Sequence, residues 1–271
     1  MQRSGFFAKG ADLNQELSAY FRSFDLVVSY LFDPDEVFRQ NVVRCGVETF
    51  IACSSQIKGG EHATMQLARP LEQLGLTLRD PAARLFPAPA DREFARAFLS
   101  GGDPKLIAVH PGSGSPAKNW PIERWLELLQ SFAVERLLVI AGEADDKQLV
   151  ALEATMRMQN IRVATNLPLP QLAAVIESCG LFIGHDSGIS HIAAAVGTRC
   201  VLLFGPTDPD VWAPAGGNVD VISASGRSLA ELSVAAVRDV AQSAIDDVMP
   251  TRSSRASEDG EGPHGSIRVL P

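Results

Sequence analysis

The segment Leu181–Pro209 constrains the fold more than any other part of the chain, because it has the form strand, loop, helix, strand, loop. Leu181–Ile183 and Cys200–Phe204 are short apolar runs that are typical of buried strands. Between them, Ile189–Val196 is a helix of small residues that ends before Gly197, a residue common just after a helix. Two buried strands joined by a helix indicate a parallel α/β sheet. In such sheets, ligands bind beyond the carboxyl ends of the strands, where both loops of this segment lie.

The same alternation of strands and helices continues on both sides of that segment, from about residue 106 to residue 248. Strands that alternate with helices predict a parallel sheet with right-handed crossovers. The further strands are expected at Leu106–His110, Arg136–Ala141, Ile161–Ala164 and Val219–Ile222, and the further helices at Ile122–Phe132, before Met158, at Leu169–Ser178 and at Leu229–Val248.

The first hundred residues show a weaker version of this pattern. Apolar runs at Phe24–Leu31 and Glu48–Cys53 predict two strands. Helical spacing extends over His62–Leu74, which is followed by a glycine that suits a helix end. Arg92–Leu99 is expected to form a further helix.

A cluster of turn-forming residues from Ser100 to Pro104 predicts a domain boundary. We therefore expect an N-terminal domain over residues 1–100 and a C-terminal domain over residues 101–248. Residues 249–271 are polar and contain few bulky apolar side chains, so we expect this tail to be disordered.

Composition excludes several classes of protein. The net charge of −8 and the absence of a basic stripe argue against a nucleic-acid partner. No apolar run approaches the length that spans a membrane, and the first residues lack the apolar core of a signal peptide. The four cysteines stand singly in apolar surroundings, which predicts buried thiols rather than disulfides or a zinc site. These features predict a cytoplasmic protein.

The loop from His110 to Pro121 is the first candidate site, since it follows a predicted strand and precedes a predicted helix. Gly112 and Gly114 would let backbone N–H groups approach a ligand closely, and Lys118 adds one cation. Together these residues could hold a diphosphate, although the loop does not match the P-loop pattern. A solvated glycine- and serine-rich turn with a surface lysine explains the same residues equally well.

The second candidate loop is Gly184–Gly188, with His191 one helical turn further on. Asp186 could cap the helix or accept a hydrogen bond from a ligand hydroxyl. Ser187 could offer its N–H to a phosphate at the start of the helix. The alternative is that Asp186 is only a cap and His191 only a core residue. Because these residues come together at the carboxyl end of a strand, the pattern favours a ligand site.

Four further acidic residues have less specific interpretations. Asp145 and Asp146 follow a predicted strand at the same sheet edge and could receive a ribose, but acids in the first turn of a helix also interact favourably with its dipole. Asp208 and Asp210 raise the idea of a metal site. They lie in a turn flanked by proline with no third ligand nearby, so we expect a structural role and no metal.

Taken together, these loops resemble a known family. The segments HPGSGSPAKNWP, AGEADD, FIGHDSGISHIAAAVG and FGPTDP occur in this order between residues 110 and 209. In this they are similar to the donor-binding half of the family 9 glycosyltransferases, the ADP-heptose:lipopolysaccharide heptosyltransferases and their relatives. The resemblance covers about residues 100–248 well and is more diffuse over residues 24–75.

This resemblance implies an α/β fold of the GT-B type, with two Rossmann-like domains and parallel sheets. It implies an inverting glycosyltransferase without metal or cofactor, which transfers a sugar, expected to be heptose from ADP-heptose, to the lipopolysaccharide core or a similar glycan. The partners would be a nucleotide-sugar donor and a glycolipid or glycan acceptor, and the resemblance leaves open a peripheral contact with the inner membrane.

The resemblance also implies roles for particular residues. Asp146 stands where the family has an acidic residue for the ribose, and the nucleoside base would pass near Leu167–Leu169. The donor-binding residues that the resemblance implies are Ser113, Gly114 and Lys118 for the diphosphate, Asp186 for the sugar, and Ser187, Gly188 and His191 for both.

The chain departs from the family at its beginning. Family members start with an apolar strand and a glycine-rich loop whose aspartate is the expected general base, and residues 1–23 contain no such pattern. We therefore expect an incomplete N-terminal domain and nominate no catalytic residue. The alternative to an active transferase is a truncated or non-catalytic nucleotide-sugar-binding remnant. A third hypothesis, a nucleotide-sugar epimerase, would need additional acids that the sequence does not supply.

Overall fold

A computed structural model describes residues 4–100, 106–133, 137–142, 150, 152, 161–248 and 267–270. The chain divides into two compact units, Met1–Asp80 and Pro81–Pro271. None of the helices in these described ranges is long and apolar enough to cross a membrane.

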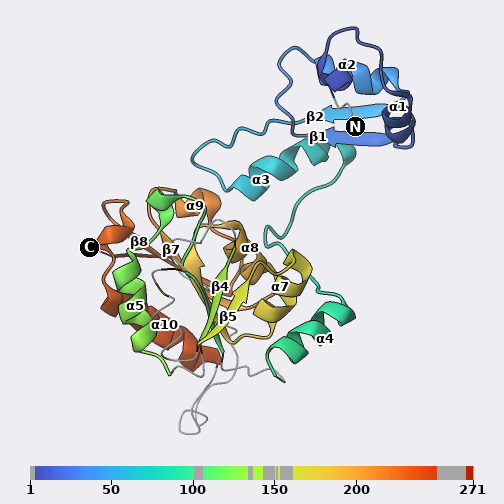
Figure 1. Cartoon of the computed structure of the whole chain (residues 1–271). Coiled ribbons are helices and arrows are strands. Elements are labelled where there is room, and N and C mark those ends of the chain that lie inside the picture. The colour runs from blue at the N-terminus through green and yellow to red at the C-terminus, as the bar shows by residue number, and fades with distance from the viewer. Residues whose placement is uncertain are drawn as a thin grey trace. The chain divides into compact units, whose positions relative to one another are not determined.

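The first unit is built around a two-stranded parallel sheet (Figure 1). Strand β1 (Leu26–Ser29) pairs with β2 (Thr49–Ala52), as the two apolar runs predicted. The helix expected over His62–Leu74 is instead α3 (Ala63–Ala68) followed by a 3₁₀ helix, because Pro70 stands at the junction and has no N–H to donate. The other helices of this unit are α1 (Gln15–Arg22), α2 (Val37–Arg44) and a short 3₁₀ turn at Ser4–Phe7.

The division between the units differs from the predicted boundary at residue 100 by about twenty residues. Helix α4 (Pro89–Phe98) belongs to the second unit, since Phe94 and Phe98 pack against that unit's core. The guanidinium of Arg92 also forms an ion pair with Glu177, at 2.7 Å. The glycine-rich break after Ser100 therefore marks a connection within the second unit.

The second unit contains a seven-stranded, all-parallel sheet (Figure 1). The strand order is β5-β4-β3-β6-β7-β8-β9. The strands are β3 (Ile107–His110), β4 (Leu137–Ala141), β5 (Arg162–Thr165), β6 (Leu181–His185), β7 (Arg199–Phe204), β8 (Val219–Ala224) and β9 (Ile267–Leu270). The described helices are α5 (Ile122–Gln130), α7 (Leu169–Glu177), α8 (Gly188–Ala195), α9 (Pro209–Trp212) and α10 (Val234–Val248), together with α4.

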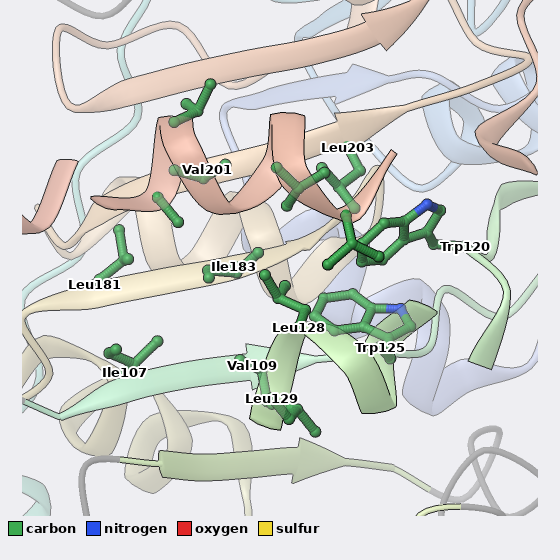
Figure 2. Close-up of a cluster of buried hydrophobic side chains, with 14 of the residues drawn as sticks. Ile107, Val109, Trp120, Trp125, Leu128, Leu129, Leu181, Ile183, Val201 and Leu203 are labelled. Carbon is green, nitrogen blue, oxygen red and sulfur yellow. The ribbon is translucent and has the colours of Figure 1, made fainter. Parts of the chain in front are cut away.

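Successive residues of a strand point to opposite faces of the sheet, and in the central strands they are all buried. Both faces of the sheet are therefore covered. Ile107 and Ile183 belong to one core, against α5 and α10, and Figure 2 shows Trp120 and Trp125 in the same core. Phe182, which lies between Leu181 and Ile183 on β6, belongs to the other core, which α4, α7 and α8 cover. Burial on both faces explains why these strands read as continuous apolar runs.

Most predicted elements of this unit are confirmed, and two differ. The helix expected over Leu229–Val248 is a 3₁₀ turn at Leu229–Glu231 followed by α10, which begins at Val234. Within the tail for which we expect disorder, residues 267–270 form strand β9, paired with β8. The rest of that tail lies outside the described residues. The helix expected before Met158 is described only at residues 150 and 152, which are helical.

Candidate functional site

The strand order creates a crevice between β3 and β6. From β3 the chain runs outward through β4 and β5, then returns to place β6 on the other side of β3 and continues to β7 and β8. The loops that follow β3 and β6 therefore lead in opposite directions and leave a crevice at the carboxyl ends of the strands. These are the two loops, His110–Pro121 and Gly184–Gly188, that the sequence singled out.

A cavity of about 490 Å³ lies at this edge of the sheet. Residues that follow β3, β4, β5 and β6 all contribute to its wall, so four loops converge on one cavity. The cavity is lined by His110, Ser113, Gly114, Ile140, Ala141, Gly142, Ala164, Asn166, Leu167, Leu169, Leu172, Ser187, Gly188 and Ile189.

One side of the cavity is polar and consists of the two predicted loops. Gly114 has a φ of +68°, a left-handed backbone conformation that glycine adopts without strain. Ser187 is the N-cap of α8, where its side chain accepts a hydrogen bond from the N–H of Ser190. The N-terminus of α8 therefore borders the cavity, and helix N-termini favour phosphate through their backbone N–H groups and dipole.

Next to this polar side, Lys118 and Asp186 form an ion pair, with Nζ 2.6 Å from Oδ2. The hydroxyl of Thr207 donates to the same carboxylate oxygen, at 2.8 Å. The Asp186 side chain is only 10% exposed and that of Lys118 is 30% exposed, so the pair is partly shielded from water. An ammonium has three N–H donors, and the pairing with Asp186 uses one of them.

The cavity also has an apolar part. Leu167, Leu169, Leu172 and Ile189 belong to its lining. Asn166 begins this part with a φ of +51° and donates its N–H to the carbonyl of Ala141, at 3.1 Å. A flat, weakly polar ring would fit against such a surface, since apolar surfaces with a few polar groups are typical of small-molecule sites.

The structure brings most of the predicted donor residues together. Ser113, Gly114, Ser187 and Gly188 line the cavity, and Lys118 and Asp186 pair beside it. Asp186 is not the helix cap, because its neighbour Ser187 has that role.

Two predicted residues stand apart from this group. His191 is exposed on α8 and is not among the described residues that line the cavity. Asp146 lies outside the described residues.

Sequence reasoning missed three residues at this site. His110, the last residue of β3, is buried and lines the cavity, with Nδ1 3.4 Å from the hydroxyl of Ser187. Asn166 and Thr207 also take part, the latter through Asp186. Each follows or ends a strand of the sheet, so its position at the carboxyl edge was the signal that could have identified it.

Of the two acids in the turn after β7, Asp208 has the structural role that we expected. The carboxylate of Asp208 caps α9 by accepting from the N–H of Asp210, at 3.1 Å. Within the described ranges, no group of three or more His, Cys, Asp or Glu side chains could hold a metal ion.

The sheet order and the cavity define a doubly wound α/β unit with a ligand crevice at its switch point. Residues 61–237, more than half of the chain, match the family model of glycosyltransferase family 9 (heptosyltransferase). The chain therefore belongs to this family, as the resemblance predicted.

Curated heptosyltransferases are similar to part of this chain. Lipopolysaccharide heptosyltransferase 2 of Salmonella typhimurium is 32% identical over 124 residues, which cover 43% of this chain and 36% of that protein. Lipooligosaccharide heptosyltransferase 2 of Haemophilus influenzae is 29% identical over 138 residues, or 48% of this chain and 40% of that protein. The matched segment thus spans well under half the length of these relatives.

Solved structures confirm the fold class. A family 9 glycosyltransferase from Veillonella parvula superimposes with a TM-score of 0.72 at 21% identity, over 85% of this chain and 77% of that chain. The ADP-heptose LPS heptosyltransferase II of E. coli superimposes with a TM-score of 0.66 at 20% identity, over 85% of this chain and 80% of that chain. An E. coli heptosyltransferase with ADP has a TM-score of 0.59 at 18% identity, over 86% of this chain and 79% of that chain. The chain has the α/β, GT-B type of fold.

Proposed function

We propose that this chain binds a nucleotide-sugar donor in the cavity of its second unit and transfers the sugar with inversion and without a metal ion. The donor of this proposal is ADP-heptose, and the acceptor is the lipopolysaccharide core or a similar glycan. The observation that carries the proposal is the cavity itself, whose lining combines a polar part, with a helix N-terminus and an adjacent cation, and an apolar part. The polar part suits a diphosphate and the apolar part a nucleoside base.

In this proposal, Lys118 and the start of α8 stabilise the leaving nucleoside diphosphate. The acceptor oxygen attacks the anomeric carbon while the bond from that carbon to the phosphate oxygen breaks, so negative charge develops on the diphosphate. Preorganised N–H donors and a cation at that point lower the energy of the transition state. They supply the positive charge that a divalent metal supplies in other enzymes.

Asp186 is assigned to the donor sugar. Lys118 and Thr207 both donate to its Oδ2. In the proposal, its other oxygen, Oδ1, accepts a hydrogen bond from a hydroxyl of the donor sugar. Lys118 would then contact both the carboxylate and the diphosphate, and so fix the sugar relative to its leaving group.

The first unit supports a role on the acceptor side. A cavity of about 290 Å³ lies at the carboxyl ends of β1 and β2, and both polar and apolar side chains line it, including an exposed phenylalanine, Phe32. Among them, Arg39 pairs with Glu36 at 2.6 Å. Mixed charged, hydroxyl and aromatic groups suit a polar glycan. We assign no general base to the acceptor hydroxyl.

Calorimetry on the full chain tests the donor site. We expect ADP and ADP-heptose to bind, and a glycan-transfer assay with ADP-heptose to release ADP. A folded protein that binds no nucleoside diphosphate and no nucleotide sugar would overturn the proposal. Binding of ADP-heptose without transfer to any lipopolysaccharide-type acceptor would overturn the transfer step and favour a non-catalytic binding protein.

A further inference from the structure

We infer that His185 is the positioning residue that holds the diphosphate loop in its binding conformation. This inference rests on the proposed function, because it assigns the loop Gly112–Trp120 to the donor's diphosphate. His185 is the last residue of β6 and is 0% exposed. It immediately precedes Asp186, the partner of Lys118.

The imidazole bridges the two ends of this loop. The backbone N–H of Trp120 donates to Nε2, at 3.0 Å. Because Nε2 accepts, the proton of the neutral ring lies on Nδ1, which donates to the carbonyl of Gly112, at 3.3 Å. One side chain thus fixes both ends of the segment that carries Ser113, Gly114 and Lys118.

Packing keeps the imidazole in this orientation. The ring of Trp125 meets it edge to face, with centroids 5.3 Å apart, and Trp120 packs against Trp125 in the same manner. The indole N–H of Trp120 also donates to the carbonyl of Leu232, at 3.1 Å. Figure 2 shows these two tryptophans side by side at the end of the core. The ring therefore sits in a dry, packed environment where its two hydrogen bonds are strong.

The dipeptide His185–Asp186 holds the loop at three points. The imidazole binds the backbone at Gly112 and Trp120, and the carboxylate binds the side chain of Lys118. A loop held in this way loses little conformational freedom when a ligand binds, which raises affinity.

His185 acts through this loop and not by touching the donor. It is not among the residues that line the cavity in the described part of the chain. Its effect should therefore fall on the diphosphate and spare the nucleoside, which the apolar wall of Leu167 and Leu169 would hold.

Three variants at this position test the inference on the full chain, with ADP and adenosine as calorimetric probes. His185→Leu removes both hydrogen bonds and leaves two buried backbone groups unpaired, so ADP should bind at least about tenfold more weakly. Adenosine affinity should stay within about twofold. His185→Gln can retain an acceptor for Trp120, and His185→Asn can retain a donor to Gly112, so both should lose less than the leucine variant.

A matched control separates positioning from general stability. Leu181→Ala removes packing from the same core at the amino end of β6, four residues before His185, and should lower the melting temperature while leaving ADP affinity within about twofold. If His185→Gln, the mildest change, and His185→Leu both keep the wild-type affinity for ADP, the inference is wrong. It is also wrong if ADP and adenosine weaken equally.

Amide hydrogen exchange distinguishes failure of this inference from failure of the proposed function. In His185→Leu, the N–H of Trp120 should exchange at least about tenfold faster than in the wild type, with or without a ligand. An unchanged exchange rate at Trp120 would show that His185 does not hold the loop. A wild-type protein that binds no ADP refutes the proposed function, and exchange at Trp120 still shows whether His185 holds the loop.

Discussion

The two parallel sheets of this chain differ in how they are covered. In the second unit, β3, β4, β6, β7 and β8 are buried along their whole length, and helices cover both faces. In the first unit, no residue of β1 is buried and only Ile51 of β2 is buried. The smaller sheet has one aromatic core, in which Phe6, Val42, Cys45 and Val47 are buried.

This difference shows what a precise binding site requires from the rest of the fold. A sheet that is buried on both faces holds the ends of its strands fixed, because dense packing allows little movement. Loops that leave β3 and β6 can then meet at hydrogen-bonding distance, as Lys118 and Asp186 do. If the two units differ in stability and in donor binding as their cores do, a substitution in one unit should leave the other unchanged.

The largest expected effect comes from Trp125→Ala in the second unit. Trp125 is 0% exposed, and its indole N–H has no hydrogen-bond partner within the described ranges, so its contribution is packing. The cavity left behind should cost about 3–5 kcal/mol in the free energy of unfolding. Urea denaturation followed by tryptophan fluorescence measures this, since all three tryptophans lie in the second unit. A loss below about 1 kcal/mol would contradict the rigid core.

Lys118→Ala is expected to have the largest effect on donor binding. The variant loses charge-assisted hydrogen bonds to the diphosphate worth about 1.5–3 kcal/mol, so calorimetry should show ADP binding about ten- to a hundredfold more weakly. It also leaves the carboxylate of Asp186 without its cation, next to the negatively charged diphosphate of ADP.

A double variant isolates that repulsion. Lys118→Ala with Asp186→Asn should bind ADP more tightly than Lys118→Ala alone, because the uncompensated carboxylate is gone. Wild-type affinity in Lys118→Ala would remove this residue from the donor site.

Phe38→Ala tests whether the first unit is independent of the donor site. Phe38 is partly buried in the aromatic core of that unit, so its removal should cost about 1–3 kcal/mol. Both tyrosines of the chain, Tyr20 and Tyr30, lie in the first unit, and tyrosine absorbance can follow its unfolding. The tryptophan transition and the affinity for ADP should not change. A tenfold weaker affinity for ADP would show that the donor site depends on the first unit.

The sequence was sufficient to predict six of the seven strands of the second unit's sheet, and most of the predicted donor residues lie at or beside its cavity. Runs such as Leu181–Ile183 are apolar because both faces are covered, and the polar residues that follow them fall at one edge. Contacts between distant residues could not be predicted. Helix α4 belongs to the second unit because it packs against that unit's core and Arg92 pairs with Glu177, and nothing in the local sequence indicates these contacts. Spacing placed His191 on the helix but could not show which way its side chain would face.

The smallest expected effect concerns the cysteines, which report on local opening without a mutation. Burial raises the pKa of Cys53 in the first unit, raises the pKa of Cys179 to about 12, and raises the pKa of Cys200 further still. Only the thiolate reacts with iodoacetamide, so labelling of all three should accelerate as the pH rises from 7 to 9.

Cys53 borders the cavity of the first unit, whereas Cys200 lies within β7 and is 0% exposed. A reagent can reach Cys200 only when the second unit opens, because its strand is covered on both sides. Peptide mass spectrometry should therefore find Cys53 labelled at least about tenfold faster than Cys200 at each pH, a difference of about 1.4 kcal/mol. Equal rates would mean that the two sheets open together, and the contrast between a rigid donor unit and a looser first unit would not hold.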